Sequence, residues 1–415
     1  MSIARLDIEA TGRNKFSFKY WRAGDSQDIQ HPYCRESLHL DRKDYYCNQM
    51  AQEIKLANQA SPDFLDSGSK EKLINSGKIL YNSLLPASIQ KELKKLTHPI
   101  LISMNDTTIP WELLHDGDDF LCVKHRISRD LHRTYHTTAA MTNFSSISAH
   151  APEQIQFFFI VNPFDPEHEL DDTFDECDTI VQSLDAANVS STYLSGEQAT
   201  LWDIKNEIAS GYDVIHYVGH IQYDKKQKRG YIQLPENLKF FPEDVGYIQG
   251  HPLVFLNGCE SDVKSRSKTK TEFYENGISL AQAFLLKGAK GVVGTIVKVP
   301  SSQAKTFACA FFECLLTGES ISESMRLARL ETREKFPNDA AFLSVVLYGY
   351  PEVTLVKLPS AADLAFFRED GSVDKAKFTS DLLKLLESAV SQAETLGSDK
   401  VEAEHLLLAL LASKK

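Results

Sequence analysis

The sequence predicts an α/β protein whose main domain is an open, mostly parallel β-sheet with helices on both faces. First, apolar runs alternate with amphipathic stretches between residues 155 and 358, as in β-α-β units whose strands pair in parallel. Second, these runs show no strict polar alternation, which is typical of strands buried on both faces. Third, shifts of composition at 136–154 and 359–376 separate this domain from an α/β lobe before it and a short α-helical segment after it.

Each element of the main domain is predicted from its own residues. Short runs rich in Val, Ile, Phe and Tyr indicate strands, and longer stretches with apolar residues three or four apart indicate helices. The predicted strands are 155–164, 189–195, 212–220, 251–259, 292–299 and 345–357. The predicted helices are 171–187, 200–211, 278–289 and one long helix from Ser302 to Lys335. In the lobe before them, a helix over 87–96 leads into a buried strand that ends at Met104.

The chain is therefore expected to have three structured parts joined by two linkers. Residues 1–135 form the first lobe, 136–154 the first linker and 155–358 the main domain. The first linker is rich in Ser, Thr, Ala and Asn and has few large apolar residues. Residues 359–376 form the second linker, and 377–415 a helical segment with apolar residues at helical spacing: Leu382, Leu385, Leu386, Ala389 and Ala393.

The composition excludes several classes of function. A net charge of −12 argues against direct binding of nucleic acid, because phosphate contacts need clustered Lys and Arg. The seven cysteines are scattered, with no CxxC pair and no Cys/His cluster of zinc-ligand spacing, so we expect free thiols, no metal and no cofactor. No apolar run reaches the ~18–20 residues of a membrane span, and the N-terminus lacks the apolar core of a signal peptide. We therefore expect a cytoplasmic protein.

Two of the predicted strands end in residues with catalytic potential. One ends in His220 and the other in Cys259, each directly after a glycine, Gly219 or Gly258, that permits a sharp turn or a close backbone approach. An imidazole and a thiol on neighbouring strand ends can form a pair in which the imidazole acts as base and acid and the thiolate attacks a carbonyl carbon. The oxyanion would be held by the backbone N–H groups of Ile221 and Cys259, which lie beside the pair.

The spacing alone leaves a plainer interpretation open. His220 would then merely cap a strand, and Cys259 would be a small buried apolar residue, as free cysteines often are. We expect His216, four residues before His220, to be structural. We also expect Cys309 and Cys314 to pack inside an apolar helix rather than to react.

Two basic stretches follow the candidate residues along the chain. Residues 224–229 follow His220, and residues 264–270 follow Cys259. They are either solvated loops or walls of a cleft, where they would raise the local potential, favour the thiolate and attract acidic substrate segments. The second stretch has the length and the helix-breaking residues of a lid or an autocleavage site.

Five segments keep the order and the intervals of a known family. They are VIHYVGH, LVFLNGCES, ISLAQAFLLKGAKGVVGTI, LLTGESISESMRLARL and VVLYGYPEVTL. Together they resemble the CHAT family of caspase-like peptidases, which belongs to the clan of caspases, separase and gingipains. An earlier stretch, IPWELLHDGDDFLCVKHRISR, resembles the part that precedes the catalytic half in this family. The resemblance covers about residues 70–356.

The resemblance implies a caspase-like fold in which the first lobe is a non-catalytic pseudo-caspase lobe. It implies that the catalytic residues are the His that ends the third core strand, here His220, and the Cys that ends the fourth, here Cys259. It further implies a thiol protease that acts on a protein substrate, is regulated by a sensor or partner protein, and works in bacterial defence or programmed death.

The sequence departs from the family pattern at two places, which keeps other hypotheses open. The family usually has Gly after the catalytic His, where this chain has Ile221, and a Trp and an acidic residue in the neighbourhood of Val297 and Ser301. The first departure supports a catalytically degenerate member that acts as a binding or scaffold module. A third hypothesis is a different α/β enzyme that uses Cys259 for acyl transfer or hydrolysis on a small molecule.

Two further expectations concern the ends of the chain. Trp111, between apolar neighbours in IPWELL, is expected to be a buried ring that packs the first lobe against the sheet. The segment LLESAVSQAETLG followed by EHLLLALL resembles the start of the N-terminal domain of Clp-type unfoldases. That resemblance implies a helical module, interrupted at Lys415, through which partner proteins dock.

Overall fold

The computed structural model describes most of the first 357 residues and a few beyond them. The described residues are 3–12, 14–24, 32–59, 67–104, 109–130, 149–161, 171–224, 226–227, 229–259, 280–297, 299–357, 384–385, 388–389 and 391. The chain forms two compact units, Met1–Lys357 and Leu358–Lys415. In the second unit the described residues are helical. The predicted linker 359–376 and most of the predicted helical segment 377–415, including its Clp-like stretch, lie outside the described residues.

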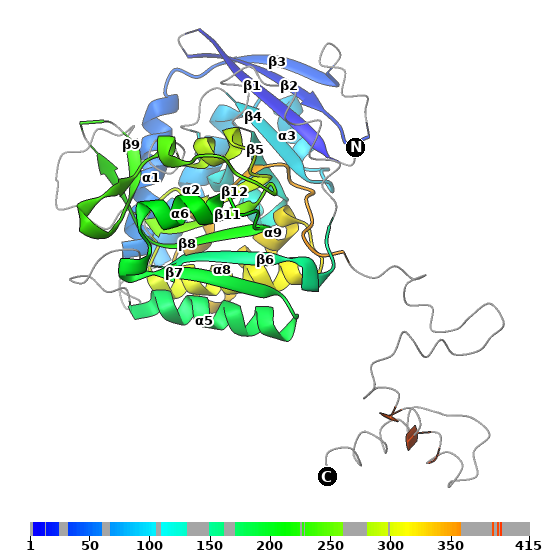
Figure 1. Ribbon diagram of the computed structural model, residues 1–415. Helices are drawn as coiled ribbons and strands as arrows, with labels where there is room; N and C mark the ends of the chain where they lie inside the picture. The colour runs from blue at the N-terminus through cyan, green and yellow to red at the C-terminus, as the bar shows by residue number, and fades with distance from the viewer. Residues whose placement is uncertain are drawn as a thin grey trace. The chain divides into compact units, whose positions relative to one another are not determined.

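The strands of the first unit form one sheet (Figure 1). In the first lobe they are β1 (Ala4–Gly12), β2 (Lys15–Trp21), β3 (Cys34–His39), β4 (Ile100–Met104) and β5 (Ile127–Asp130). In the main domain they are β6 (Gln156–Val161), β7 (Ser190–Ser195), β8 (Val214–Asp224), β9 (Arg229–Gln233), β10 (Lys239–Phe240), β11 (Leu253–Cys259), β12 (Gly291–Thr295) and β13 (Val345–Gly349). The strand order is β10-β9-β8-β11-β12-β13-β5-β4-β1-β2-β3, and β6 joins β8 to β7.

Helices cover both faces of this sheet, as predicted. They are α1 (Lys43–Gln59), α2 (Ser67–Leu84), α3 (Ala87–Leu93), α4 (Leu121–Lys124), α5 (Asp171–Ala186), α6 (Leu201–Ile208), α8 (Ser301–Leu316) and α9 (Ile321–Lys335), and residues 280–286 are also helical. The pairs β7–β6, β6–β8, β8–β11, β11–β12, β13–β5, β5–β4 and β4–β1 are parallel. The predicted class, a mostly parallel α/β sheet, is confirmed.

The sheet crosses from the main domain into the first lobe without interruption. β13 runs antiparallel to β12 and parallel to β5, where Tyr348 is the register partner of Arg129. Of the predicted linker between the two parts, residues 136–148 lie outside the described residues. Its last residues include His150, which forms a β-bridge with Val356. The division at 136–154 stays a prediction.

Strand alternation divides the apolar core into two layers. On β6, Phe157 and Phe159 pack on the face that α5, α8 and α9 cover, whereas Phe158 and Ile160 pack on the face that α1, α2 and α6 cover. Both faces of this strand are therefore buried, which explains its continuous apolar run.

The long helix predicted from Ser302 to Lys335 is wrong, because the chain breaks it into α8 and α9. Gly318 has a φ of +88°, which a helix cannot contain. The Ser320 hydroxyl then accepts a hydrogen bond from the backbone N–H of Glu323 and caps the start of α9. In the segment TGES, Gly318 therefore stops α8 and Ser320 starts α9.

Trp111 is buried in the larger apolar layer, as predicted, with 1% of its surface exposed. Its indole N–H lies 3.3 Å from the sulfur of Met104 at the end of β4. The next residue, Glu112, forms a buried ion pair with Arg129 on β5. The segment IPWELL therefore holds the interior of the first lobe together.

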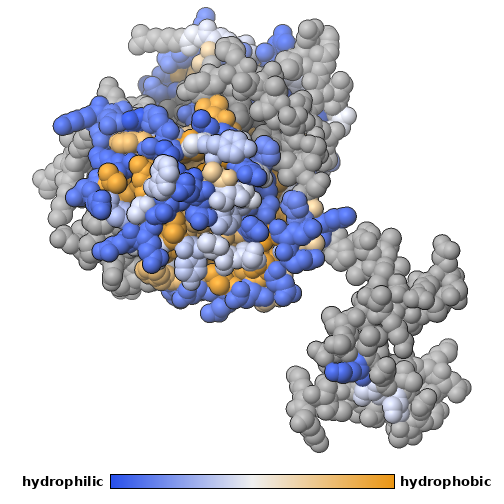
Figure 2. Space-filling view, in the orientation of Figure 1, coloured by the Kyte–Doolittle hydropathy of each residue, from blue (hydrophilic) through white to orange (hydrophobic). Residues whose placement is uncertain are grey.

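The surface shown in Figure 2 is largely hydrophilic, with small separate apolar patches. Across the described ranges, no helix combines the length and the apolar character needed to cross a membrane.

Candidate active site

His220 and Cys259 are direct register partners at one edge of the sheet. They lie on the neighbouring parallel strands β8 and β11, where the register also pairs His216 with Phe255. Neighbouring strands lie about 4.8 Å apart, so the backbone alone brings the two positions together. The edge is the C-terminal one, where open α/β sheets place their functional residues. The catalytic role of the two residues stays a prediction.

β8 does not end at His220, which corrects the predicted strand over 212–220. It continues to Asp224, and from Ile221 onward it pairs antiparallel with β9. The residues after His220 alternate apolar and polar side chains, a pattern typical of a hairpin strand. His220 therefore lies at a fork, where β8 leaves β11 and joins β9, rather than in a turn.

The two glycines before the pair provide space rather than a turn. Neither Gly219 nor Gly258 has a positive φ. A Cβ at Gly258 would lie 2.8 Å from the carbonyl oxygen of Gly219 and 2.9 Å from the ring of Tyr217. A Cβ at Gly219 would lie 2.7 Å from the hydroxyl of Tyr217. The sequence allows two roles for these glycines, a sharp turn or a close backbone approach. The structure shows the close approach, which leaves room for the buried ring of Tyr217.

Two hydroxyl groups hold the backbone on either side of the pair. The Tyr217 hydroxyl donates to the carbonyl of His220 at 2.7 Å, and the Thr295 hydroxyl donates to the carbonyl of Gly258 at 2.9 Å. Because a peptide group is planar, a fixed carbonyl also fixes the N–H of the next residue. Those N–H groups belong to Ile221 and Cys259, the two oxyanion donors that the sequence suggests.

Ile221 fits its position without backbone strain. Its φ is not positive, and its side chain packs in the larger apolar layer with 5% of its surface exposed. A glycine is therefore not required by the backbone here. At the second departure, Val297 is buried after β12, and Ser301 is the first residue of α8.

A buried polar cluster joins α5 to both strands of the fork. The Glu176 carboxylate on α5 accepts a hydrogen bond from His216 Nε2 at 2.8 Å, and Asn257 Nδ2 donates to both carboxylate oxygens at 2.9 and 2.7 Å. Their exposed fractions are 2% for Glu176, 0% for His216 and 9% for Asn257. Three phenyl rings surround the imidazole, with centroid distances of 5.1–5.5 Å: Phe159, Phe255 and Phe312.

Sequence reasoning does not single out Glu176, Asn257, Tyr217 or Thr295. A signal for two of them exists in retrospect. Asn257 interrupts an apolar strand run, and Glu176 occupies the same helix face as the buried Ile180 and Leu184. A polar residue at an apolar position requires a partner, but the pattern alone does not say which one.

Four of the described cysteines have thiols that are poorly suited to nucleophilic attack. Burial raises the pKa of the Cys122 and Cys309 thiols to about 12, and raises that of Cys177 further. A thiol with so high a pKa stays protonated and unreactive at neutral pH. Cys314 shows the same direction, because burial and nearby carboxylates raise its pKa. Within the described ranges, no group of three or more His, Cys, Asp or Glu residues is placed to hold a metal ion.

The basic stretch after His220 connects β8 to β9, and its two end residues, Asp224 and Arg229, form ion pairs. Lys239 on β10 donates to Asp224, which lowers the pKa of that carboxyl to about 2. Arg229 pairs with Glu243 and lies over the Phe241 ring, with its guanidinium carbon 4.3 Å from the ring centroid. The second stretch, 264–270, lies outside the described residues.

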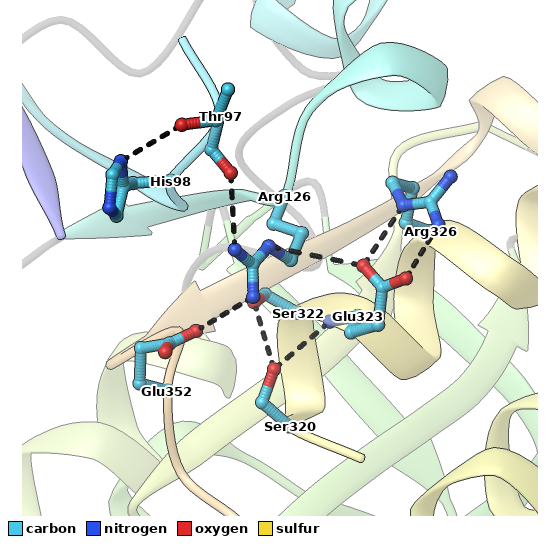
Figure 3. Close-up of polar contacts among 8 residues, drawn as sticks. All are labelled: Thr97, His98, Arg126, Ser320, Ser322, Glu323, Arg326 and Glu352. Carbon is cyan, nitrogen blue, oxygen red and sulfur yellow. Dashed lines mark hydrogen bonds and ion pairs between the residues drawn. The ribbon is translucent and has the colours of Figure 1, made fainter. Parts of the chain in front are cut away.

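A polar cavity of about 410 Å³ lies where the first lobe meets α9, and Figure 3 shows the polar contacts of its lining residues Arg126, Glu323 and Arg326. Arg126 donates to the carbonyl of Thr97 at 3.3 Å and lies 3.4 Å from Glu352 and 3.9 Å from Glu323. Glu323 in turn pairs with Arg326 through two hydrogen bonds. These charges compensate one another. We therefore interpret the ion pairs beside the cavity as contacts that join the first lobe to the main domain.

Known proteins similar to this chain share its fold. The sequence profile of the CHAT domain family matches residues 75–347, which is more than half of the chain. Separase, in the Saccharomyces cerevisiae separase–securin complex, superposes with a TM-score of 0.54 at 12% identity, over 85% of this chain and 30% of the separase chain. The Arg-specific cysteine proteinase gingipain R has a TM-score of 0.45 at 11% identity, over 76% of this chain and 75% of its own. Among curated proteins, no sequence matches.

Proposed function

The chain belongs to the CHAT domain family, and we propose that it is a cysteine endopeptidase that cleaves protein substrates through a dyad of His220 and Cys259. The observation that carries the proposal is the register of β8 and β11, which makes the two residues direct neighbours at the C-terminal edge of the sheet. The likeness to separase supports the fold of such an enzyme, over about 30% of the separase chain.

The proposed reaction follows from the chemistry of the two side chains. The His220 imidazole takes the proton of the Cys259 thiol, and the thiolate attacks the carbonyl carbon of the scissile peptide bond. The C–N bond breaks as the imidazolium gives its proton to the leaving amine, which leaves a thioester on Cys259. A water molecule, deprotonated by His220, then attacks the thioester and releases the acid and the free thiol.

The developing oxyanion would be held by the backbone N–H groups of Ile221 and Cys259. The hydroxyls of Tyr217 and Thr295 support this role, because each fixes the peptide plane that carries one of these N–H groups. The unstrained backbone of Ile221 weakens the main argument for a degenerate, non-cutting member.

The test is labelling and hydrolysis with peptides whose P1 residue is varied. We expect peptide chloromethyl ketones to label the wild-type protein at Cys259, and fluorogenic peptide amides to be cleaved. Cys259→Ala should abolish labelling and lower hydrolysis by roughly three orders of magnitude or more. Cys309→Ala, at an unreactive helical thiol, should change neither.

Three outcomes distinguish the hypotheses. Peptide-dependent labelling that requires Cys259 supports the endopeptidase. No labelling of the folded wild-type protein contradicts it and favours a binding or scaffold module. Labelling by small acyl donors but by no peptide favours a different α/β enzyme.

The proposal also covers regulation, location and biological role. Regulation and role rest on the family resemblance, and the location rests on the expected free thiols. The enzyme would work in the cytoplasm, under the control of a regulatory or sensor protein, in bacterial defence or programmed death. Residues 377–415 would dock partner proteins. Deletion of 358–415, the second compact unit, should then leave peptide hydrolysis within about twofold of wild type while weakening partner binding. Loss of the folded first unit on deletion would contradict this role.

A further inference from the structure

We infer that Glu176 is a positioning residue for the dyad, because its buried carboxylate ties together the two strands that carry His220 and Cys259. The inference rests on the proposed function for its catalytic meaning. Its structural part, the alignment of the two strand ends, can be tested without any substrate.

The contacts place the carboxylate between the two strands. Glu176 binds His216, four residues before His220 on β8, and Asn257, two residues before Cys259 on β11. The Glu176 side chain thereby restrains the position of β8 relative to β11 along the strand direction. The backbone hydrogen bonds between β8 and β11 set the register of this pair, and the carboxylate adds a side-chain tie from α5 to the same two strands.

The position of the cluster along β8 matters because the strand changes partners just beyond it. β6 pairs with β8 only as far as Val218, and β9 pairs with it from Ile221 onward. The β8–β11 pairing is thus the part of the ladder that continues to His220. The contacts of Glu176 therefore restrain β8 and β11 close to the point where β8 loses β6 as a partner and gains β9.

The burial of the cluster indicates a role beyond packing. A carboxylate that is 2% exposed is costly to desolvate, and apolar residues of similar volume are often as stable or more so. Within the described part of the chain, Nδ1 of His216 is buried and has no hydrogen-bond partner. The neutral tautomer with the proton on Nε2 satisfies Glu176 and leaves only a lone pair among the phenyl rings. Such a cluster defines one geometry rather than maximising stability.

The helix that carries Glu176 packs beside α8 and is joined to it by an ion pair at the surface. Asp175, the preceding residue, pairs with Lys305 on α8. α8 also supplies Phe312, one of the rings around His216. We call Glu176 and its contacts to His216 and Asn257 the clamp. The clamp joins α5, and α8 beside it, to the strand ends.

The decisive variants exchange the carboxylate and the amide between positions 176 and 257. Glu176→Gln keeps the shape but replaces one carboxylate oxygen by an NH2 group, so Asn257 Nδ2 can no longer donate to two oxygens. Asn257→Asp alone places two carboxylates against each other. The double variant Glu176→Gln/Asn257→Asp again pairs an amide with a carboxylate and keeps an acceptor for His216.

We expect Glu176→Gln to lower kcat by roughly 10–100-fold with KM within about twofold, because sub-ångström displacement of reacting groups costs rate and not binding. The double variant should recover kcat to within about threefold of wild type. The substrate is the fluorogenic peptide amide that the wild-type protein cleaves fastest. The rate of carbamidomethylation of Cys259 by iodoacetamide, read by mass spectrometry, should fall and recover in parallel.

The matched control is Glu112→Gln, which changes a buried carboxylate of the first lobe that pairs with Arg129 on β5. Each variant is assayed well below its own Tm. If Glu112→Gln lowers kcat as much as Glu176→Gln does, or if the double variant recovers nothing, the inference is wrong. Should Glu176→Gln fail to fold, Asn257→Ser gives the same comparison, since it removes one tie and keeps the Glu176–His216 contact.

The two proposals can fail separately. If the wild-type protein cleaves no peptide, but alkylation of Cys259 slows in Glu176→Gln and recovers in the double variant, the endopeptidase fails and the clamp stands. If the wild type cleaves peptides and Glu176→Gln has the same kcat and alkylation rate, the clamp fails and the endopeptidase stands.

Discussion

The first lobe and the main domain each bury a carboxylate beside the sheet, but they give it different partners. In the first lobe Glu112 pairs with Arg129, and both are almost fully buried. In the main domain Glu176 binds His216 and Asn257, which lie on two different strands. A guanidinium is a permanent cation that holds its partner wherever it lies. An imidazole and an amide on separate strands instead align those strands.

The strands beside each cluster also end in different kinds of residue. β4 and β5 of the first lobe end at Met104 and Asp130, whereas β8 and β11 lead to the paired positions His220 and Cys259. The two parts share a mostly parallel β-sheet with helices on its faces. If the two proposals hold, the first lobe uses its buried charge for cohesion, and the main domain uses it to align the proposed dyad.

The largest expected effect tests the cohesive role of the first lobe. Arg129→Met leaves Glu112 buried without its cation, so we expect the free energy of unfolding to fall by about 3–5 kcal/mol. The value of kcat per folded molecule should stay unchanged. Urea denaturation gives the first quantity, and peptide hydrolysis corrected for the folded fraction gives the second.

The control is the double variant Arg129→Met/Glu112→Leu, which removes both charges and should recover most of the lost stability. A fall in kcat that persists in this double variant would mean that the first lobe contributes to alignment of the dyad, and the contrast between the two parts would not hold.

The second prediction concerns a buried charge of the main domain outside the dyad. Burial lowers the pKa of Lys290, just before β12, to about 8, although Asp213 opposes the shift. Between pH 8 and 10.5 the unfolded state binds more protons than the folded state, so stability should rise with pH across that window. Lys290→Met should therefore be more stable than wild type at pH 7, by up to roughly 3 kcal/mol, with no difference above pH 10.5.

Urea denaturation at pH 7, 9 and 10.5 checks this prediction, with kcat measured alongside at pH 7. We expect kcat to stay within about twofold of wild type, because Lys290 precedes β12 at the edge of the sheet opposite the dyad. A stability difference that is independent of pH would show that the ammonium group is not the cause.

The elements of the main domain could be predicted because each depends on its own residues. The run around Phe157–Phe159 is apolar on both faces and is a strand in any context that buries it. The predictions are wrong where the pattern continues across a change of partner or direction, as in the strand predicted over 345–357, which ends at Gly349. β8 extends past His220 because β9 offers a new partner, and α8 ends because Gly318 takes a positive φ.

The support of the candidate site could not be predicted in the same way. Glu176 lies 40 residues from His216 and 81 from Asn257 in the sequence, so only the folded sheet brings the three together. Tyr217 looks like an ordinary core tyrosine in an apolar strand. Its hydroxyl finds the carbonyl of His220 only because two glycines leave room for the ring.

The smallest expected effect on stability gives the sharpest comparison of the two parts. Tyr217→Phe removes one hydrogen bond to a backbone carbonyl, so we expect a loss of about 1 kcal/mol. Tyr81→Phe is the matched change in the first lobe, because Tyr81 is also buried and donates to the carbonyl of Gln90 at 3.3 Å. The two variants should therefore have similar free energies of unfolding.

Their activities should differ. Freeing the His220 carbonyl loosens the peptide plane that carries the Ile221 N–H, so Tyr217→Phe should lower peptide hydrolysis roughly 10-fold, less than complete removal of an oxyanion donor. Alkylation of Cys259 by iodoacetamide forms no oxyanion and should stay within about twofold of wild type. Tyr81→Phe should change neither rate. Equal losses of hydrolysis and alkylation in Tyr217→Phe would mean that the tyrosine supports the dyad itself and not the oxyanion donors.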